Sequence, residues 1–171
     1  KGEKVFLNIH YVTPAFFKLY DIKVIEGEIP DINKENRRTV FVVNKAALKA
    51  LGYTSINGAG VIEENQKRAN ANASLQPIVA VVEDYFEGHL TSGIKPTIYP
   101  VGARFSGDLY QIAYTPGKKK EVIDFLRNLE YKLYGSEDFE YTFLEDDIKA
   151  MYTQDRQTAT IYSIFASIAI I

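Results

Sequence analysis

The hydrophobic pattern of the first thirty residues predicts a strand, a short helix and a second strand. Val5–Tyr11 alternates apolar and polar positions, which indicates a half-buried strand. Thr13 and Pro14 then provide the N-cap and the first-turn proline of a helix that ends near Tyr20. Ile22–Ile25 follows as a second strand. The order is that of a compact βαβ unit with a short crossover.

The same order of patterns returns later in the chain. Leu109–Thr115 alternates again, an amphipathic helix follows, and Phe139–Leu144 is a further alternating stretch. Gly135 stands where the helix would need a C-terminal cap. The apolar face of the predicted helix is formed, at positions i, i+3, i+4, i+7 and i+11, by Val122, Phe125, Leu126, Leu129 and Leu133. Two βαβ units predict an α+β fold of the split βαβ, ferredoxin-like kind.

Between these units, residues 37–96 have elements of their own. Thr39–Val43 and Pro77–Val82 are continuous apolar stretches, as in strands that are buried on both faces. Asn44 can cap a helix that runs to Leu51, and the polar stretch Asn65–Ser74 predicts a loop or a hairpin tip. We therefore expect a small β-rich subdomain inserted into the split βαβ fold.

The C-terminal stretch permits two interpretations. Glu145–Asp147 suits the start of a helix, no charge follows Arg156, and Ile161–Ile171 is strongly apolar. The helix either docks on the core of its own domain or is the beginning of a membrane span. A helix from Glu145 to Ile171 would be about 40 Å long, too long to lie on a domain of this size without projecting. This length favours the span, and a start at Lys1 without methionine or signal peptide is expected of a piece of a longer protein.

Composition excludes some classes of function. The formal charge of −2 gives no electrostatic basis for binding nucleic acid. The absence of cysteine rules out disulfides and thiolate metal sites and leaves the redox compartment open. Twelve tyrosines and ten phenylalanines favour strands.

Residues that could support catalysis are few. A histidine–carboxylate pair could form from His89 with Asp84 or Glu83, but this spacing is not specific, and His10 lies on the more exposed face of its predicted strand. The acids Glu145–Asp147 point in different directions on a helix and are better explained as capping. Two other stretches have simple structural explanations: Gly58–Gly60 is a turn, and Lys118–Lys120 is a solvated helix face. No catalytic, cofactor-binding or metal-binding residue is therefore predicted, and no cofactor.

Four groups of residues follow one another between Tyr11 and Ala166. They are Tyr11-x-x-Thr13-Pro-x-Phe16-Phe17-x-x-Tyr20 with Ile25-x-Gly27, Val42-Val43-Asn44-x-Ala46-Ala47 with Leu51-Gly52, Ile78–Leu90 with Ile94-x-Pro96, and Phe143-Leu-x-Asp146-Asp147-x-x-x-x-Tyr152 before Ile164-Phe165-Ala166. In this order they resemble the MacB-like periplasmic core domain of FtsX-like ABC transporter permeases, in particular the Bacteroidetes type. Two positions depart from the family pattern. Lys45 stands where an acid is usual, and Ala80 replaces a glycine.

The resemblance implies a porter-like α+β subdomain at residues 1–36 and 97–144, an inserted sabre-like subdomain at 37–96, and a stalk helix at 145–171 that enters a transmembrane helix. It also implies the function of an extracytoplasmic permease domain in the inner membrane, on the periplasmic side, without catalytic residues. Such a domain relays ATP-driven conformational change to periplasmic partners or substrates.

The partners implied by the resemblance are a cytoplasmic ABC ATPase domain or subunit, a second permease copy, and a periplasmic adaptor or substrate. An alternative from another class is an extracytoplasmic sensor or ligand-binding domain of a membrane receptor. A third is a hydrolase, which the scarcity of histidine and the lack of cysteine disfavour. The cargo cannot be assigned from this domain.

Overall fold

The computed structural model describes residues 4–31, 39–62, 74–86, 93–102, 109–150 and 152–153. The chain divides into two compact units, Lys1–Tyr110 (unit 1) and Gln111–Ile171 (unit 2), and each is described by itself. The fold class is mixed α+β, as the sequence predicts, with a six-stranded mixed sheet in unit 1.

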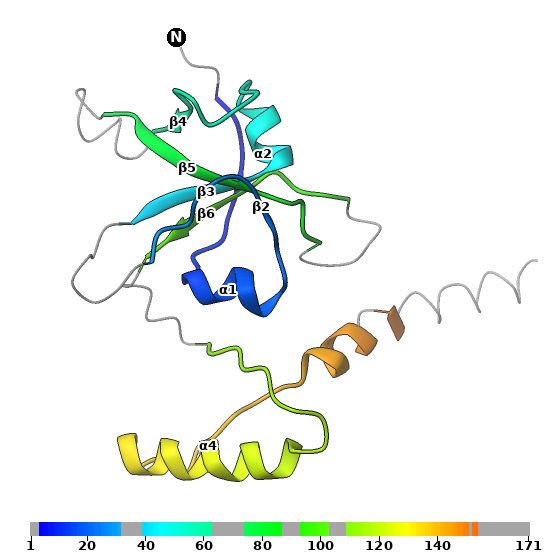
Figure 1. Ribbon diagram of the computed structural model, residues 1–171. Coiled ribbons are helices and arrows are strands. Elements are labelled where there is room, and N and C mark those ends of the chain that lie inside the picture. The colour runs from blue at the N-terminus through cyan, green and yellow to red at the C-terminus, as the bar shows by residue number, and fades with distance from the viewer. Residues whose placement is uncertain are drawn as a thin grey trace, which may run out of the picture. The chain divides into compact units, whose positions relative to one another are not determined.

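The sheet of unit 1 has the strand order β1-β6-β3-β5-β2, and β4 pairs with the start of β5 (Figure 1). Two pairs, β1 with β6 and β3 with β5, are parallel, and the other pairs are antiparallel. The elements of this unit are β1 (Asn8–Ile9), α1 (Pro14–Leu19), β2 (Val24–Gly27), β3 (Val40–Asn44), α2 (Lys45–Ala50), β4 (Gly60–Val61), β5 (Gln76–Val82) and β6 (Thr97–Val101).

The helices α1 and α2 cover opposite faces of the sheet (Figure 1). On one face, Phe17 of α1 packs with side chains of β3, β5 and β6 that include Val42 and Tyr99. On the other face, Leu48 of α2 packs against Val43 and Val81. The central strands are therefore buried on both sides. This explains why the stretches predicted at Thr39–Val43 and Pro77–Val82 are apolar throughout, and both strands are confirmed.

The elements predicted for residues 5–25 occur in the predicted order of strand, helix and strand, but the two strands are not neighbours. β1 lies beside β6 at one edge of the sheet and β2 lies beside β5 at the other, so the connection that contains α1 crosses the sheet. β6 itself has no counterpart in the sequence interpretation, and it contains Pro100, although proline is unusual in a central strand. The N–H groups of Asn8, His10 and Val12 donate to the carbonyls of Pro96, Ile98 and Pro100, but Pro100 has no N–H to donate in return. We attribute to this gap the shortness of β1, which is followed only by an isolated bridge at Val12.

Unit 2 contains the predicted amphipathic helix, α4 (Lys119–Tyr134), and Gly135 caps it in the left-handed conformation, with φ of 69°. A further helix covers residues 144–150, and residues 152–153 are helical as well. The prediction of strands at Leu109–Thr115 and Phe139–Leu144 is wrong. Residues 109–115 and 139–143 are described without strand pairing, and residue 144 is already helical. Alternation gives a segment strand propensity, but a strand also needs a partner edge for its backbone hydrogen bonds.

The sheet does not separate at the predicted subdomain boundaries. β3 and β5, from the predicted insertion 37–96, share it with β1, β2 and β6, from the predicted segments 1–36 and 97–144. The division that the structure does have falls at Tyr110, inside the second of these segments. The predicted stalk and membrane helix extends beyond the described residues, since 154–171 lie outside them. Among the residues that are described, no helix is long and apolar enough to span a bilayer.

Candidate functional site

The structure does not bring together the histidine–carboxylate pair considered from the sequence, because His89 lies outside the described residues. Oδ1 of Asp84 accepts a hydrogen bond from the backbone N–H of Ala46, at 3.0 Å, and so satisfies a donor in the first turn of α2. Glu83 is exposed. Within the described part of the chain, no cluster of three or more His, Asp or Glu side chains could hold a metal ion.

His10 lies at the edge of an aromatic cluster between α1 and the sheet. We define this cluster as His10, Phe16, Tyr20, Tyr85 and Tyr99. The ring of Phe16 is at its centre, 5.6 Å from that of His10, 5.0 Å from that of Tyr20, 6.3 Å from that of Tyr85 and 6.1 Å from that of Tyr99. Tyr99 is fully buried, whereas Phe16, Tyr20 and Tyr85 are half-buried. Of the neighbouring aromatic residues Phe16, Phe17 and Tyr20, Phe17 is buried in the core, whereas the other two are half-buried.

A buried amide links three segments of unit 1. Oδ1 of Asn44 accepts from the N–H of Ala47 at 2.8 Å, which is the predicted helix cap. The same oxygen accepts from the N–H of Thr97 at 3.0 Å, and Nδ2 donates to the carbonyl of Lys95 at 2.8 Å. The last two bonds join α2 to the start of β6. No local pattern could have predicted them, because their partners are about fifty positions away.

The acids at 145–147 occupy the first turn of the helix at 144–150, as predicted. Oε1 of Glu145 lies 2.8 Å from Nζ of Lys149, while Oδ2 of Asp147 accepts from the hydroxyl of Thr142 at 3.2 Å. The hydrogen bond between Lys149 and Glu145 lowers the pKa of Glu145 and raises the pKa of Lys149. Both side chains are exposed, so the pair is a surface ion pair and not a catalytic carboxylate site.

Two of the lysines at the start of α4 have partners within unit 2. Nζ of Lys118 lies 2.7 Å from Oε1 of Glu121, and the ammonium of Lys119 lies 3.3 Å from the centre of the Phe143 ring. A turn is present at residues 57–58, with φ of 71° at Gly58, while Gly60 already belongs to β4.

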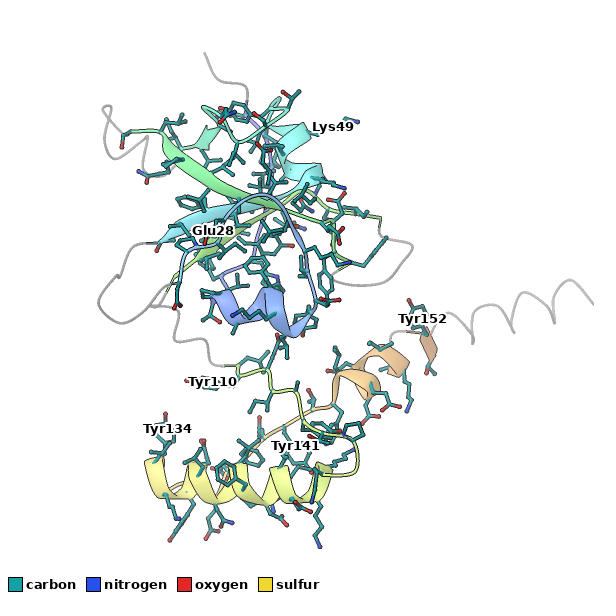
Figure 2. The ribbon with its side chains drawn as sticks, viewed as in Figure 1. Glu28, Lys49, Tyr110, Tyr134, Tyr141 and Tyr152 are labelled. Carbon is teal, nitrogen blue, oxygen red and sulfur yellow. The ribbon has the colours of Figure 1, made fainter. Side chains whose placement is uncertain are left out.

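The apolar face of α4 is largely exposed. The predicted amphipathic helix forms, yet none of its residues is buried. Phe125, Leu129 and Leu133 expose 65%, 39% and 64% of their surface. Figure 2 shows side chains projecting outward along α4, with Tyr134 at its end, in contrast to the crowded interior around the sheet. We call Val122, Leu126, Leu129 and Leu133 the α4 stripe.

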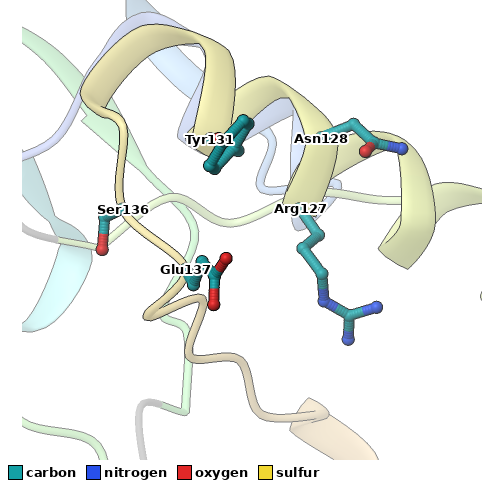
Figure 3. Close-up of a pocket in the computed structure, with 5 residues that line it drawn as sticks. All are labelled: Arg127, Asn128, Tyr131, Ser136 and Glu137. Atoms are coloured by element: carbon teal, nitrogen blue, oxygen red, sulfur yellow. The ribbon is translucent and has the colours of Figure 1, made fainter.

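A hollow of about 390 Å³ lies beside the C-terminal half of α4 (Figure 3). It is lined by Arg127, Asn128, Tyr131, Ser136 and Glu137. Four of these residues are exposed and Ser136 is half-buried. Sites for small molecules enclose most of the ligand in a largely apolar cavity, so this open, polar hollow is a poor candidate.

No protein-family model matches the chain, and neither the curated proteins nor the solved structures include a significantly similar one. Among the described residues, the exposed apolar face of α4 is the candidate for a surface that contacts partners. The sequence predicted the apolar face of α4 but not its exposure, because periodicity shows which residues share a face and not what covers them.

Proposed function

We propose that the chain is the extracytoplasmic domain of an ABC transporter permease of the MacB/FtsX type. In this proposal, residues 1–36 and 97–144 are its porter-like part, 37–96 its sabre-like part, and 145–171 its stalk and entry to the membrane. The domain relays ATP-driven conformational change, supplied by a cytoplasmic ATPase, to periplasmic partners or substrates.

The observation that carries the proposal is that its resemblance motifs contact one another in unit 1. Gly27, at the end of the first motif, packs so closely on β5 that a Cβ there would lie 2.1 Å from the carbonyl oxygen of Val79. Asp84, in the third motif, accepts the N–H of Ala46, in the second. Three residues of these motifs, Gly27, Ala46 and Asp84, therefore join segments of unit 1 that are far apart in the sequence.

Unit 2 supports a role in relaying movement. The helix at 144–150 starts with an acidic turn, and the sequence after it loses all charge beyond Arg156. A continuous helix is a stiff element that can transmit a shift without local unfolding. The α4 face, which lacks any buried residue, is suited to contacts with other parts of an assembly.

The alternative of a sensor or ligand-binding domain is less well supported. Such a domain needs a cavity that encloses its ligand, and the hollow beside α4 does not provide one. A kinase or methyl-accepting region after Ile171 in the parent protein would favour the sensor. Further hydrophobic helices there, with an ABC ATPase in the same or a neighbouring reading frame, would favour the transporter.

The location can be tested by thiol labelling, because the chain has no cysteine of its own. Lys49 is an exposed residue of α2 (Figure 2), and we suggest Lys49→Cys in the parent protein. A membrane-impermeant maleimide should label it in cells whose outer membrane alone is permeabilised. Labelling only after the inner membrane is broken would place the domain in the cytoplasm and contradict the proposal. The transporter class is tested separately, by co-purification of the parent protein with ATP hydrolysis activity.

A further inference from the structure

The described residues of unit 2 cover the α4 stripe only in part: Val122 and Leu126 are half-buried, whereas Leu129 and Leu133 are exposed. The extended residues 139–143 lie along another side of the helix, where Lys119 contacts the Phe143 ring and Arg127 lies 6.0 Å from the centre of the Phe139 ring. These contacts leave Leu129 and Leu133 exposed. A helix of 16 residues rarely persists in water unless its apolar face packs on something, so the stripe needs an occupant.

The spacing of the stripe shows which occupant fits. Its four residues are separated by four, three and four positions, which is the spacing of the seam in paired helices. The set is also symmetric about a point midway between Arg127 and Asn128. An antiparallel copy of α4 in this register places Val122 opposite Leu133, and Leu126 opposite Leu129, and each layer occurs twice. A second copy of the chain therefore complements the stripe without a gap.

Charge and dipoles favour the antiparallel direction. The lysines Lys118–Lys120 are clustered at the start of α4, so a parallel pair would bring two like-charged clusters together. An antiparallel pair separates them and opposes the two helix macrodipoles favourably. In this arrangement Lys132 of one copy also reaches the flank occupied by Phe125 of the other, where an ammonium and an exposed ring can contact each other.

We propose that the α4 stripe is a homodimerisation surface, on which the α4 helices of two copies pair antiparallel about a two-fold axis. The inference does not rest on the transporter assignment, since a sensor domain could pair in the same way. A helix of this length is about 24 Å long. The seam alone is smaller than a standard interface of about 800 Å² per partner, so the association should depend on protein concentration.

Single cysteines test both the surface and the register, since the chain contains no cysteine of its own. Val122→Cys and Leu133→Cys proteins are prepared separately, and each is oxidised alone and as an equal mixture. We expect cross-linked dimer mainly in the mixture, at least about tenfold faster than in either protein alone. The reason is that position 122 faces position 133 of the copy, whereas two residues at 122 would be roughly 16 Å apart along the seam, beyond the reach of a disulfide.

The cross-linking pattern also identifies the wrong arrangements. Cross-linking of each protein alone would show a parallel pair and overturn the antiparallel proposal. Equal rates in all three samples would indicate random collision, and an absence of cross-links would show that the stripe is not at an interface. A dimer formed through the apolar C-terminal stretch would not produce the selective pairing of 122 with 133.

Sedimentation of the unmodified chain provides the second measurement. Leu129→Glu should shift the protein from dimer to monomer, while the control Asn128→Glu, one position away on the helix and outside the seam, should leave the dimer unchanged. If the stripe is covered within one chain, the unmodified protein is monomeric and Leu129→Glu lowers its Tm. If the stripe binds a membrane instead, the chain sediments with anionic lipid vesicles as a monomer. Either result would contradict the proposal.

Discussion

At the scale of single residues, Asn44 has three roles that depend on one another. Its side chain is fully buried, caps α2, and holds the start of β6 through Lys95 and Thr97. Removing this amide leaves the N–H groups of Ala47 and Thr97 without a partner, while the carbonyl of Lys95 still accepts from the hydroxyl of Thr97. The local sequence predicted the helix cap, because the cap joins Asn44 to Ala47, only three positions away. It could not predict the long-range bonds, which depend on how the strands pair.

We predict that Asn44→Ala lowers the free energy of unfolding by about 2–4 kcal/mol, since it removes a helix cap and leaves buried backbone groups unsatisfied. Denaturant unfolding followed by tyrosine fluorescence measures this change, because the chain has twelve tyrosines and no tryptophan. The control is Asn57→Ala, at an exposed position, which should stay within about 0.5 kcal/mol of the unmodified protein. Equal effects of the two substitutions would show that the network contributes no stability.

A second residue-scale prediction compares two glycines with the same backbone conformation. Gly27 and Gly52 have φ of 78° and 79°, so alanine is strained at both, by about 1–2 kcal/mol. A Cβ at Gly52 meets nothing within 4 Å, whereas one at Gly27 meets the backbone of β5. Gly27→Ala should therefore destabilise the protein by about 1–3 kcal/mol more than Gly52→Ala in the same unfolding measurement. Equal losses would mean that β2 moves away from β5 without cost.

At the scale of elements, the sequence predicted best those segments whose pattern has one explanation. The fully apolar strands β3 and β5, and the periodic helix α4 with its glycine cap, lie close to their predicted positions. The prediction failed where a segment depends on its neighbours. β6 was missed because of its proline, and residues 109–115 and 139–143 alternate without forming strands. In each case, whether the segment forms a strand depends on which neighbouring strand shares its backbone hydrogen bonds. The sequence of the segment does not reveal that neighbour.

The helix at 144–150 gives a prediction of pH dependence. The hydrogen bond with Lys149 lowers the pKa of Glu145 from its ordinary value of 4.5, so the contribution of the pair to the helix is present above that value. It is lost as the pH falls through the lowered pKa, and at the alkaline end as the pH rises through the raised pKa of Lys149. An NMR titration should place the Glu145 carboxyl below 4.5, and Lys149→Met should return it toward that value. A Glu145 carboxyl that titrates equally in both proteins would show that the ion pair does not form in solution.

The lever role in the proposed function belongs to the same helix. Ala150→Pro removes a helical N–H and places its ring against the preceding turn, which costs about 3 kcal/mol within a helix. We expect the parent transporter to lose transport while unit 1 keeps its far-UV circular dichroism and its unfolding midpoint. Ala150→Ser, which keeps the N–H, is the matched control and should transport normally. Normal transport by the proline variant would remove the lever from the mechanism.

At the scale of the whole molecule, burial is divided unequally. All the buried side chains among the described residues lie in unit 1, around the sheet, and none lies in α4. Unit 1 has a hydrophobic cluster on each face of its sheet, as expected of a unit that folds by itself. The described residues of unit 2 form helices without a fully buried side chain, whereas helices in water gain most of their stability from packing. We therefore expect the stability of α4, but not that of the sheet, to depend on protein concentration.

Hydrogen exchange measured by mass spectrometry tests that difference on the intact chain. Amides of β3, β5 and β6 should exchange slowly at every protein concentration, since opening them requires the sheet to unfold. Amides of α4 should exchange quickly in dilute samples and become protected as the concentration rises, because pairing with a second copy buries the stripe. Leu129→Glu should abolish that gain in α4 and leave the sheet unaffected. Protection of α4 that is strong and independent of concentration would instead show that the same chain covers the stripe, and the dimer would then have no role in stabilising unit 2.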